Sequence, residues 1–247
     1  MIDLHCHIMP WVDDGASDAR TACAMAQRAV ESGITTIVAT PHCNLDDSRP
    51  NFRGRTYTKA FSLFRALLAQ HNLPLEILPG AELFAHPSNL RYLLDRQKVV
   101  TLNHSRYLLV EFNFSERGGN ITDALNLISR RGLVPVVAHP ERYDCVQLEP
   151  ELAMDWFHAG YIIQLNKGSI LGQLGPEPKE TGNFLLQNGF AHVIASDAHS
   201  TRRRRTGFQS LIPVLERFCS PEYIDLLLKG NPQAIIEDRP ILVEPFR

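Results

Sequence analysis

Two histidines near the start of the chain are the first residues that could do chemistry. His5 and His7 end a short apolar segment, residues 2–5. Side chains at positions i and i+2 of a strand point to the same face, so a strand here would aim both imidazoles at one point. Buried imidazoles need a partner for their lone pairs, and a metal ion is the obvious candidate. A histidine pair on a strand predicts little by itself, because pairs that lie at the surface or form hydrogen bonds are about as frequent as pairs that bind a metal.

Most of the later apolar segments also end in a histidine or a carboxylate. In chain order these residues are Asp13 and Asp14 in a loop, His42, Glu82, Glu111, His139, Asp197 and His199. Any one of them has an ordinary explanation, such as a helix cap or a hydrogen bond to a carbonyl. Gathered without cations, however, they would place several like charges at close range. They are too many for one ion, so the pattern predicts more than one metal of a kind that imidazole and carboxylate suit, such as Mn, Zn or Fe.

Apolar and amphipathic segments alternate along the chain and must position these residues. We expect strands at residues 2–5, 34–40, 75–82, 107–112, 134–138, 161–165 and 192–196, and helices at 17–32, 57–71, 88–95, 121–132, 149–158, 179–188, 207–218 and 221–229. This alternation predicts an α/β fold with a parallel sheet, either a closed or nearly closed barrel or a doubly wound open sheet. In both folds the functional residues lie at the C-terminal ends of the strands.

The composition indicates a soluble globular chain, and we expect a single domain over residues 1–247. A formal net charge of -2 gives no field that would attract nucleic acid or an anionic membrane. No apolar run approaches the roughly 20 residues of a spanning helix, and no basic segment of a signal peptide precedes the first strand. The five scattered cysteines suit reduced thiols, so we expect a cytoplasmic protein. The sequence favours no oligomeric state.

The order of the motifs resembles the polymerase-and-histidinol-phosphatase (PHP) superfamily, and within it the bacterial protein tyrosine phosphatases of capsule and exopolysaccharide loci. The motifs are His-x-His at 5–7, Asp-Asp-Gly at 13–15, Thr-Pro-His at 40–42, Gly-Ala-Glu at 80–82, Glu-Phe at 111–112, Ala-His-Pro-Glu-Arg-Tyr at 138–143 and Ala-Ser-Asp-Ala-His at 195–199. The resemblance implies a distorted, TIM-barrel-like (β/α)7 barrel of PHP type. It also implies three divalent metal ions, with Mn²⁺ as the first choice and Fe, Zn or Mg as alternatives.

The resemblance further implies how the ligands are shared among the ions. His5, His7, Glu82 and Asp197 would bind the first ion, Glu82, Glu111 and His139 the second, and Asp14, His42 and His199 the third. Other branches of the superfamily have histidines at the positions of Asp14 and Glu111, so these two carboxylates point to the tyrosine phosphatase branch. The choice of Asp14 over Asp13 rests on the resemblance alone.

The implied activity is hydrolysis of a phosphomonoester by a metal-bound hydroxide, with phosphotyrosine on the tail of a cognate tyrosine autokinase as the substrate. Three divalent ions and four carboxylates would leave a charge of about +2, which suits a phosphate dianion. Arginines would complete the clamp on the phosphoryl oxygens. The candidates are Arg142 and, in the run 202–205, Arg204 with Arg205 as a further substrate-binding residue. The alternative for this run is a solvated face or a polyanion patch.

Other functions are also possible on the sequence. Among enzymes, histidinol-phosphate phosphatase or another small-molecule PHP phosphoesterase is the alternative, and a non-catalytic metal-stabilised scaffold is the alternative of another class. A thiol phosphatase is rejected, although Cys43 and Arg49 match its His-Cys-x5-Arg pattern, because Asp46 and Asp47 would raise the thiol pKa and repel phosphate. The loop 44–56 could be a lid, a docking surface or a plain excursion. We expect structural roles for His71, His86, His104, His158 and His192, and core or rim packing for Trp11 and Tyr143.

Overall fold

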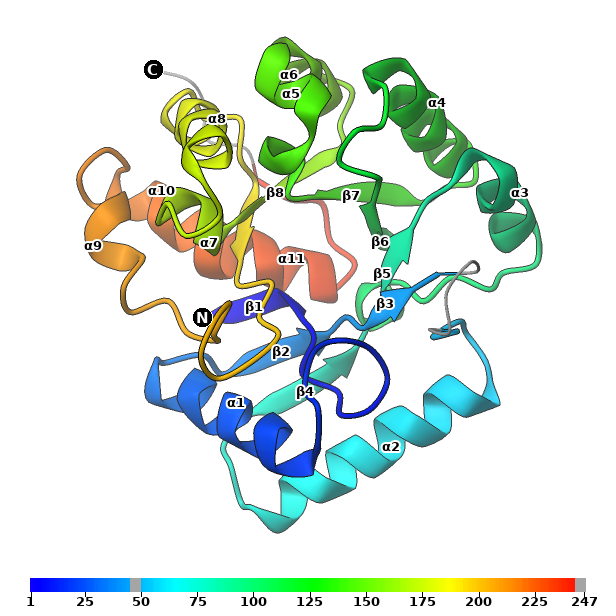
Figure 1. Cartoon of the computed structure of the whole chain (residues 1–247), viewed down its shortest axis with the longest axis vertical. Coiled ribbons are helices and arrows are strands. Elements are labelled where there is room, and N and C mark those ends of the chain that lie inside the picture. The colour runs from blue at the N-terminus through cyan, green and yellow to red at the C-terminus, as the bar shows by residue number, and fades with distance from the viewer. Residues whose placement is uncertain (45–49, 243–247) are drawn as a thin grey trace.

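Parallel strands and helices alternate along the chain in the computed structural model, which describes residues 1–44 and 50–242 (Figure 1). The strands are β1 (Ile2–Cys6), β2 (Thr36–Ala39), β3 (His42–Cys43), β4 (Glu76–Pro79), β5 (Glu82–Phe84), β6 (Tyr107–Glu111), β7 (Val134–Ala138), β8 (Ile162–Asn166) and β9 (Val193–Ala195). All ladders between these strands are parallel. The expected α/β class is therefore confirmed.

Two of the expected strands are interrupted before they reach their C-terminal ends. The segment expected at 34–40 continues beyond Pro41 as β3, and the segment expected at 75–82 forms β4 and then β5. The interruptions divide the strands into a sheet of order β1-β2-β4 and a sheet of order β3-β5-β6-β7-β8-β9. At the second interruption the hydroxyl of Tyr57 donates to the Gly80 carbonyl (2.7 Å) and accepts from the Gly80 N–H (3.0 Å). The backbone groups freed by this interruption are thus still hydrogen-bonded.

Backbone contacts between β9 and β1 bring the last strand back to the first. Cys6 forms a parallel bridge with Ala198. The Asp197 N–H donates to the His5 carbonyl (2.8 Å), and the His7 N–H donates to the Ala198 carbonyl (2.9 Å). The strands therefore form a ring of seven positions, with β2 and β3 sharing one position and β4 and β5 another. This is the expected distorted (β/α) barrel, although its hydrogen bonds form two sheets and not one continuous ladder.

Helices surround this ring, and most lie where the sequence predicts them (Figure 1). They are α1 (Ala19–Glu31), α2 (Arg55–Gln70), α3 (Pro87–Asp95), α4 (Gly118–Ser129), α5 (Asp144–Leu148), α6 (Glu151–His158), α7 (Lys167–Ile170), α8 (Pro176–Gln187), α9 (Ile212–Leu215), α10 (Pro221–Asp225) and α11 (Asn231–Ile236), with short turns η1 (Leu102–His104), η2 (Pro140–Arg142) and η3 (Leu226–Gly230). Asp18 begins α1 by accepting from the Thr21 N–H (2.7 Å). Gly33, with a φ of 82°, follows its end. None of the helices in the described residues is long and apolar enough to cross a membrane.

The C-terminal helices differ from the prediction. The helix expected over 207–218 shrinks to α9, because Gly207 has a φ of 99° and Phe208 turns its fully buried ring into the core. The helix expected over 221–229 instead extends through η3 into α11. Pro232 does not end it: Pro232 lies in the first turn of α11, directly after η3, and the helical path continues through it.

An apolar cluster fills the interior of the ring below the strand ends. It combines strand residues Ile2, Leu4, Val38, Leu109, Val136, Ala138, Ile162 and Val193 with Leu102, Ile235 and Ile236. Because the contributing strands stand on all sides of the ring, these side chains occupy its interior, and α11 covers the end opposite the functional residues. Burial of this apolar surface stabilises the fold by about 25 cal/mol per Å². It therefore holds in place the strands that carry the polar residues.

Candidate metal centre

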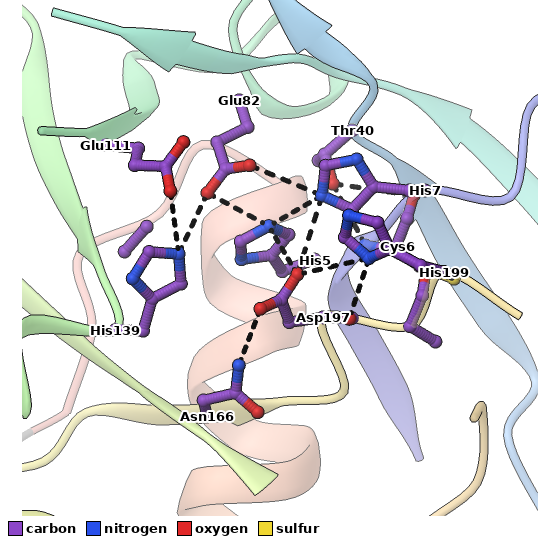
Figure 2. Close-up of polar contacts among 12 residues, drawn as sticks. His5, Cys6, His7, Thr40, Glu82, Glu111, His139, Asn166, Asp197 and His199 are labelled. Atoms are coloured by element: carbon purple, nitrogen blue, oxygen red, sulfur yellow. Dashed lines mark hydrogen bonds and ion pairs between the residues drawn. The ribbon is translucent and has the colours of Figure 1, made fainter. Parts of the chain in front are cut away.

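The nine predicted ligands converge on the C-terminal side of the strands. Figure 2 shows His5, His7, Glu82, Glu111, His139, Asp197 and His199 among them. Their ligand atoms form four overlapping groups, within each of which they lie within 4.8 Å of one another. The groups are His5, His7 and Glu82; His5, His139 and Asp197; His42, Glu82 and Glu111; and His7, Asp14, His42 and His199. The structure thus brings all nine together, but His42 and His139 each reach residues outside the set that the resemblance implies for them.

A register shift in β1 aims His5 at this centre. Asp3 pairs with Ile37 and Cys6 pairs with Ala39, so Leu4 and His5 together stand opposite the single residue Val38. Such a bulge lets two successive side chains leave the strand on the same side. Leu4 packs into the apolar interior, while His5 contacts the polar residues above it. The alternation expected for residues 5–7 holds beyond the bulge.

Hydrogen bonds fix the tautomers of the first two histidines. The amide Nε2 of Gln164 donates to the Leu165 carbonyl (2.8 Å), so its Oε1 accepts from His5 Nδ1 (2.8 Å). His7 Nδ1 donates to Asp13 Oδ2 (2.7 Å). When both imidazoles are neutral, the two Nε2 atoms, 3.1 Å apart, face each other with lone pairs and no proton between them. Two facing lone pairs in a fully buried site fit a cation that binds both.

Glu82 lies at the middle of the cluster and is 1% exposed. Its Oε1 lies 3.2 Å from His5 Nε2 and 3.1 Å from His139 Nε2. Its Oε2 lies 3.3 Å from His7 Nε2 and 3.0 Å from His42 Nδ1. Each oxygen therefore faces a different pair of imidazoles, as a carboxylate bridging two ions would. Burial raises the pKa of Glu82, but the neighbouring histidines outweigh it and lower the pKa well below its usual value.

The buried Asp197 closes the opposite side of the cluster. Its Oδ1 lies 3.5 Å from Nε2 of both His5 and His7. Its Oδ2 accepts from Asn166 Nδ2 (2.6 Å) and from Arg142 Nη1 (3.3 Å). Oε2 of Glu82 is buried without a hydrogen-bond partner among the described residues, and Oδ1 of Asp197 has an ion pair with Arg204 but no hydrogen bond there. Two such carboxylate oxygens, each aimed at imidazole nitrogens, again fit the metal ions that the resemblance implies.

The remaining group of ligands lies toward solvent. His42 Nε2 is 3.5 Å from Asp14 Oδ1, and His199 Nε2 is 3.8 Å from the same oxygen. The side chain of Asp14 is 50% exposed, whereas those of His5 and His7 are fully buried. A ligand can therefore approach the centre from the side of Asp14.

Asp13 and Asp14 have different surroundings, which bears on the choice between them. Asp13 Oδ2 accepts from His7 Nδ1 and from the His42 N–H (3.0 Å), and its Oδ1 accepts from the Gly15 N–H (2.9 Å). All of these hydrogen bonds hold protein groups, so the surroundings of Asp13 suit a residue that orients His7, while Asp14 shares a group with three histidines. Gly15 permits this loop, because a Cβ there would lie 2.1 Å from the His7 carbonyl oxygen.

The buried carboxylates also raise the pKa of His7. Burial lowers this pKa, but Asp13 and Glu82 outweigh it and bring it to about 10. By contrast, burial and the charge of Arg142 lower the pKa of His139 to about 4. The pocket thus retains a proton on His7 and keeps His139 neutral. Such an anionic pocket suits a divalent cation, whose binding releases protons.

Left-handed backbone conformations turn two strand ends toward the centre. His139 has a φ of 36° and Asp197 a φ of 49°. Such conformations are uncommon for residues other than glycine, and they cluster at functional sites. His139 follows β7 directly and Asp197 follows β9 after one residue, and both carry the chain into turns that leave their side chains pointing inward (Figure 2).

The three predicted arginines do not all point to the centre. Arg142 lies beside Asp197, and its Cζ is 4.3 Å from the ring centroid of Phe114. Arg204, with a φ of 46°, forms an ion pair with Asp197 Oδ1 and donates from Nε to the Asp197 carbonyl (3.1 Å). Arg205 is exposed and lines a surface hollow with Arg28 and Glu31.

Sequence reasoning missed the residues that orient the ligands. Gln164 and Asn166 end β8, the strand for which no functional residue is predicted, and they bond to His5 and Asp197 respectively. Their spacing of two at a strand end is the pattern that identifies His5 and His7, so it could have identified them. Phe114, 38% exposed and stacked on Arg142, is carried by no motif.

The histidines expected to be structural lie outside the four groups. His71, His86, His104 and His158 are exposed, and His192 is buried against Phe157 with a ring distance of 4.3 Å. Tyr143 is fully buried and donates to the Ala138 carbonyl (2.8 Å), so it packs in the core. Trp11 is 70% exposed.

Cys43 does not have the surroundings of a nucleophile. Its thiol is fully buried, and burial raises its pKa well above the usual value. Arg49 of the rejected pattern and residues 45–49 of the predicted loop lie outside the described residues. In the described part of that loop, Asn51 donates to the Val12 carbonyl (3.0 Å) and the His42 carbonyl (2.7 Å).

Comparisons with known proteins agree with this geometry. The family model for capsular polysaccharide synthesis proteins CpsB/CapC matches residues 1–237. The chain is 33% identical over 245 residues to the tyrosine-protein phosphatase YwqE of Bacillus subtilis, covering 99% of this chain and 95% of the relative. It is 27% identical over 250 residues to the tyrosine-protein phosphatase CpsB of Streptococcus pneumoniae, covering 97% and 99%.

Solved structures are similar as well. A structure from work on YwqE from Bacillus subtilis and CpsB from Streptococcus pneumoniae, described as unique metal-dependent tyrosine phosphatases, matches with a TM-score of 0.90 and 32% identity over 99% of this chain and 98% of the other. The lactonase Lmo2620 from Listeria monocytogenes matches with a TM-score of 0.55 and 11% identity, over 97% of this chain and 92% of the other, and so shares the fold alone.

Proposed function

Since the chain belongs to the CpsB/CapC family of capsular polysaccharide synthesis, we propose that it is a metal-dependent protein-tyrosine phosphatase of capsule or exopolysaccharide biosynthesis. The observation that carries the proposal is the facing pair of His5 and His7 Nε2 atoms, 3.1 Å apart, beside the buried carboxylates of Glu82 and Asp197. The names of YwqE and CpsB, each spanned nearly in full, supply the substrate class.

We assign the nine converging residues as ligands of three divalent ions, with Mn²⁺ as the first choice and Fe, Zn or Mg as alternatives. His5, His7, Glu82 and Asp197 would hold the first ion, Glu82, Glu111 and His139 the second, and Asp14, His42 and His199 the third. The placement of Glu82 between two imidazole pairs supports a bridging role. Bound ions of this kind polarise phosphoryl oxygens and activate water for hydrolysis.

The chain's own residues would bind and orient the phosphate. Arg142 and Arg204 would bind the phosphoryl oxygens that the metal ions do not bind, since both guanidinium groups already lie against Asp197. Arg205 would contribute at most from the rim, because its side chain is exposed. Phe114 would keep the Arg142 guanidinium in place by stacking.

The proposed substrate is a phosphotyrosine protein, the tail of a cognate tyrosine autokinase. A cytoplasmic location and the absence of nucleic-acid and membrane partners stay predictions from the sequence.

Turnover by metal-loaded and metal-free protein tests the function. We expect the Mn²⁺-loaded protein to hydrolyse p-nitrophenyl phosphate and a phosphotyrosine peptide, and to stop when EDTA removes the metal. Faster hydrolysis of histidinol phosphate than of the peptide would instead identify a small-molecule phosphatase. A metal-replete sample that hydrolyses none of the three would favour the non-catalytic scaffold.

A further inference from the structure

The arginine run at residues 202–205 has two kinds of member. Arg204 turns inward to Asp197, while Arg202, Arg203 and Arg205 are exposed. Arg205 shares a hollow with Glu31. Within the described residues, Arg202 and Arg203 form no ion pair. The phosphate clamp of the proposed function uses neither of them.

Hydrogen bonds hold the backbone of this run in one shape. The His199 N–H donates to the Arg204 carbonyl (2.9 Å), and the Arg202 N–H donates to Ser200 Oγ (3.3 Å). Lys167, which is 2% exposed, donates from Nζ to the carbonyls of Arg205 and Gly207, the latter at 3.0 Å. Lys167 therefore holds the C-terminal end of the run. The turn that contains Arg202 and Arg203 is held by the bonds of His199 and Ser200 to Arg204, Arg202 and Arg203.

The loop stands next to the proposed centre. His199 and Arg204, on either side of Arg202 and Arg203 in sequence, both contact residues of the centre, with the rings of His199 and His7 3.8 Å apart. In Figure 1 the loop follows β9 and passes in front of β1, beside the loop that carries Asp14. A peptide whose phosphotyrosine entered the centre would therefore place its neighbouring residues within reach of this loop.

The positive charge of Arg202 and Arg203 determines which substrate residues would bind favourably beside them. The chain has a formal net charge of -2, so adjacent exposed arginines on a fixed loop are a local exception. Like charges held side by side repel each other, and carboxylates arriving with a substrate would relieve this repulsion and steer the substrate inward.

We propose that Arg202 and Arg203 form a docking site for acidic residues that flank the phosphotyrosine, so that the substrate is an acidic phosphopeptide segment. The inference rests on the proposed function, because it requires the phosphotyrosine to bind at the metal centre.

The experiment compares two phosphotyrosine peptides that differ only in their flanking residues, acidic in one and neutral in the other. At low ionic strength we expect kcat/KM for the acidic peptide to exceed that for the neutral one by about tenfold. In the double variant Arg202→Gln/Arg203→Gln this preference should fall to about twofold or less, with p-nitrophenyl phosphate turnover unchanged. Salt at about 0.5 M should remove the preference of the wild type, because screening then acts over about 4 Å.

Matched controls separate this inference from the function itself. The double variant Arg65→Gln/Arg130→Gln loses the same charge from exposed positions on α2 and after α4, and it should keep the preference. Peptides with a non-hydrolysable phosphonate in place of phosphotyrosine give Kd values that need no turnover. A protein that hydrolyses neither peptide but binds the acidic phosphonate more tightly through Arg202 and Arg203 would refute the phosphatase and keep the docking site.

Two results would overturn the docking site. One is equal Kd and kcat/KM for the two peptides in the wild type. The other is a preference that survives in Arg202→Gln/Arg203→Gln. A single-stranded oligonucleotide that binds through these arginines, while the peptides show no difference, would identify a polyanion patch instead.

Discussion

Replacing Asp13 by asparagine tests whether the metal centre depends on a carboxylate that binds no metal. The three N–H groups around Asp13 all donate to it, from His7 at 2.7 Å, His42 at 3.0 Å and Gly15 at 2.9 Å. Asparagine keeps the shape but offers one acceptor oxygen and one NH₂ group. In either orientation this NH₂ faces a backbone N–H, that of His42 or that of Gly15. In the orientation toward His42 it also faces His7 Nδ1, so His7 would have to move its own proton to Nε2, the atom that faces Glu82.

The size of the effect follows from these contacts. A buried donor without a partner costs about 1–3 kcal/mol. Loss of a carboxylate that orients a ligating histidine lowers metal affinity or activity by about 10–100-fold, equivalent to about 1.4–2.7 kcal/mol. We therefore expect Mn²⁺ affinity of Asp13→Asn to fall by a factor in this range, with kcat/KM at saturating Mn²⁺ also reduced.

Calorimetric titration of the metal-free proteins with Mn²⁺ measures the affinity, and phosphotyrosine peptide hydrolysis measures kcat/KM. Asp18→Asn is the matched control in the same segment, because asparagine caps a helix as well as aspartate does and Asp18 bonds only within the N-terminal region of α1. Wild-type metal affinity and turnover in a folded Asp13→Asn protein would refute the claim that His7 needs a fixed tautomer.

Four further substitutions probe separate parts of the structure. His139→Ala should abolish turnover and lower the metal content measured by mass spectrometry; full activity would remove His139 from the centre. Arg142→Ala should keep its metal but lose roughly 100-fold in kcat/KM, as for removal of a charge-stabilising donor, and unchanged kinetics would contradict its role. Cys43→Ser should leave turnover unchanged, since the thiol is buried; inactivity of the folded variant would revive the thiol mechanism. Burial lowers the pKa of His192 from 6.5 to about 3, so between these values only the unfolded chain gains the proton. Stability should then fall as pH falls, by up to about 1.4 kcal/mol per unit, and His192→Gln should lack this part of the slope in chemical denaturation; equal slopes would disprove it.

The convergence of the polar residues could be predicted because parallel strands impose a simple rule. A polar residue at the end of a buried apolar run emerges on the C-terminal side of the sheet, as Glu111 and His139 do, and so do His42 and Glu82, which begin β3 and β5 after β2 and β4 have ended. The rule tolerates the two interrupted strands, because each interruption precedes the residue that matters.

The role of Asp13, the bulge in β1 and the inward turn of Arg204 could not be predicted in the same way. Whether Asp13 or Asp14 faces the histidines depends on the path of a loop, and no periodicity fixes that path. The bulge at Leu4 and His5 depends on the partner strand, because it arises from pairing two residues with Val38. Similarly, Arg204 differs from its neighbours in the run only through its left-handed backbone. These features come from tertiary contacts, which a local pattern does not contain.

The seam between β1 and β9 has a consequence for how the molecule is made. Cys6 and Ala198 are 192 residues apart, so during synthesis the outer edge of β1 stays unpaired until the segment around Ala198 has been made. Until then His5 and His7 have no carboxylate from Asp197 beside them. The proposed metal centre is thus complete only after Asp197 and His199 have been made, and an ion bound there would connect the two strands that meet at this seam.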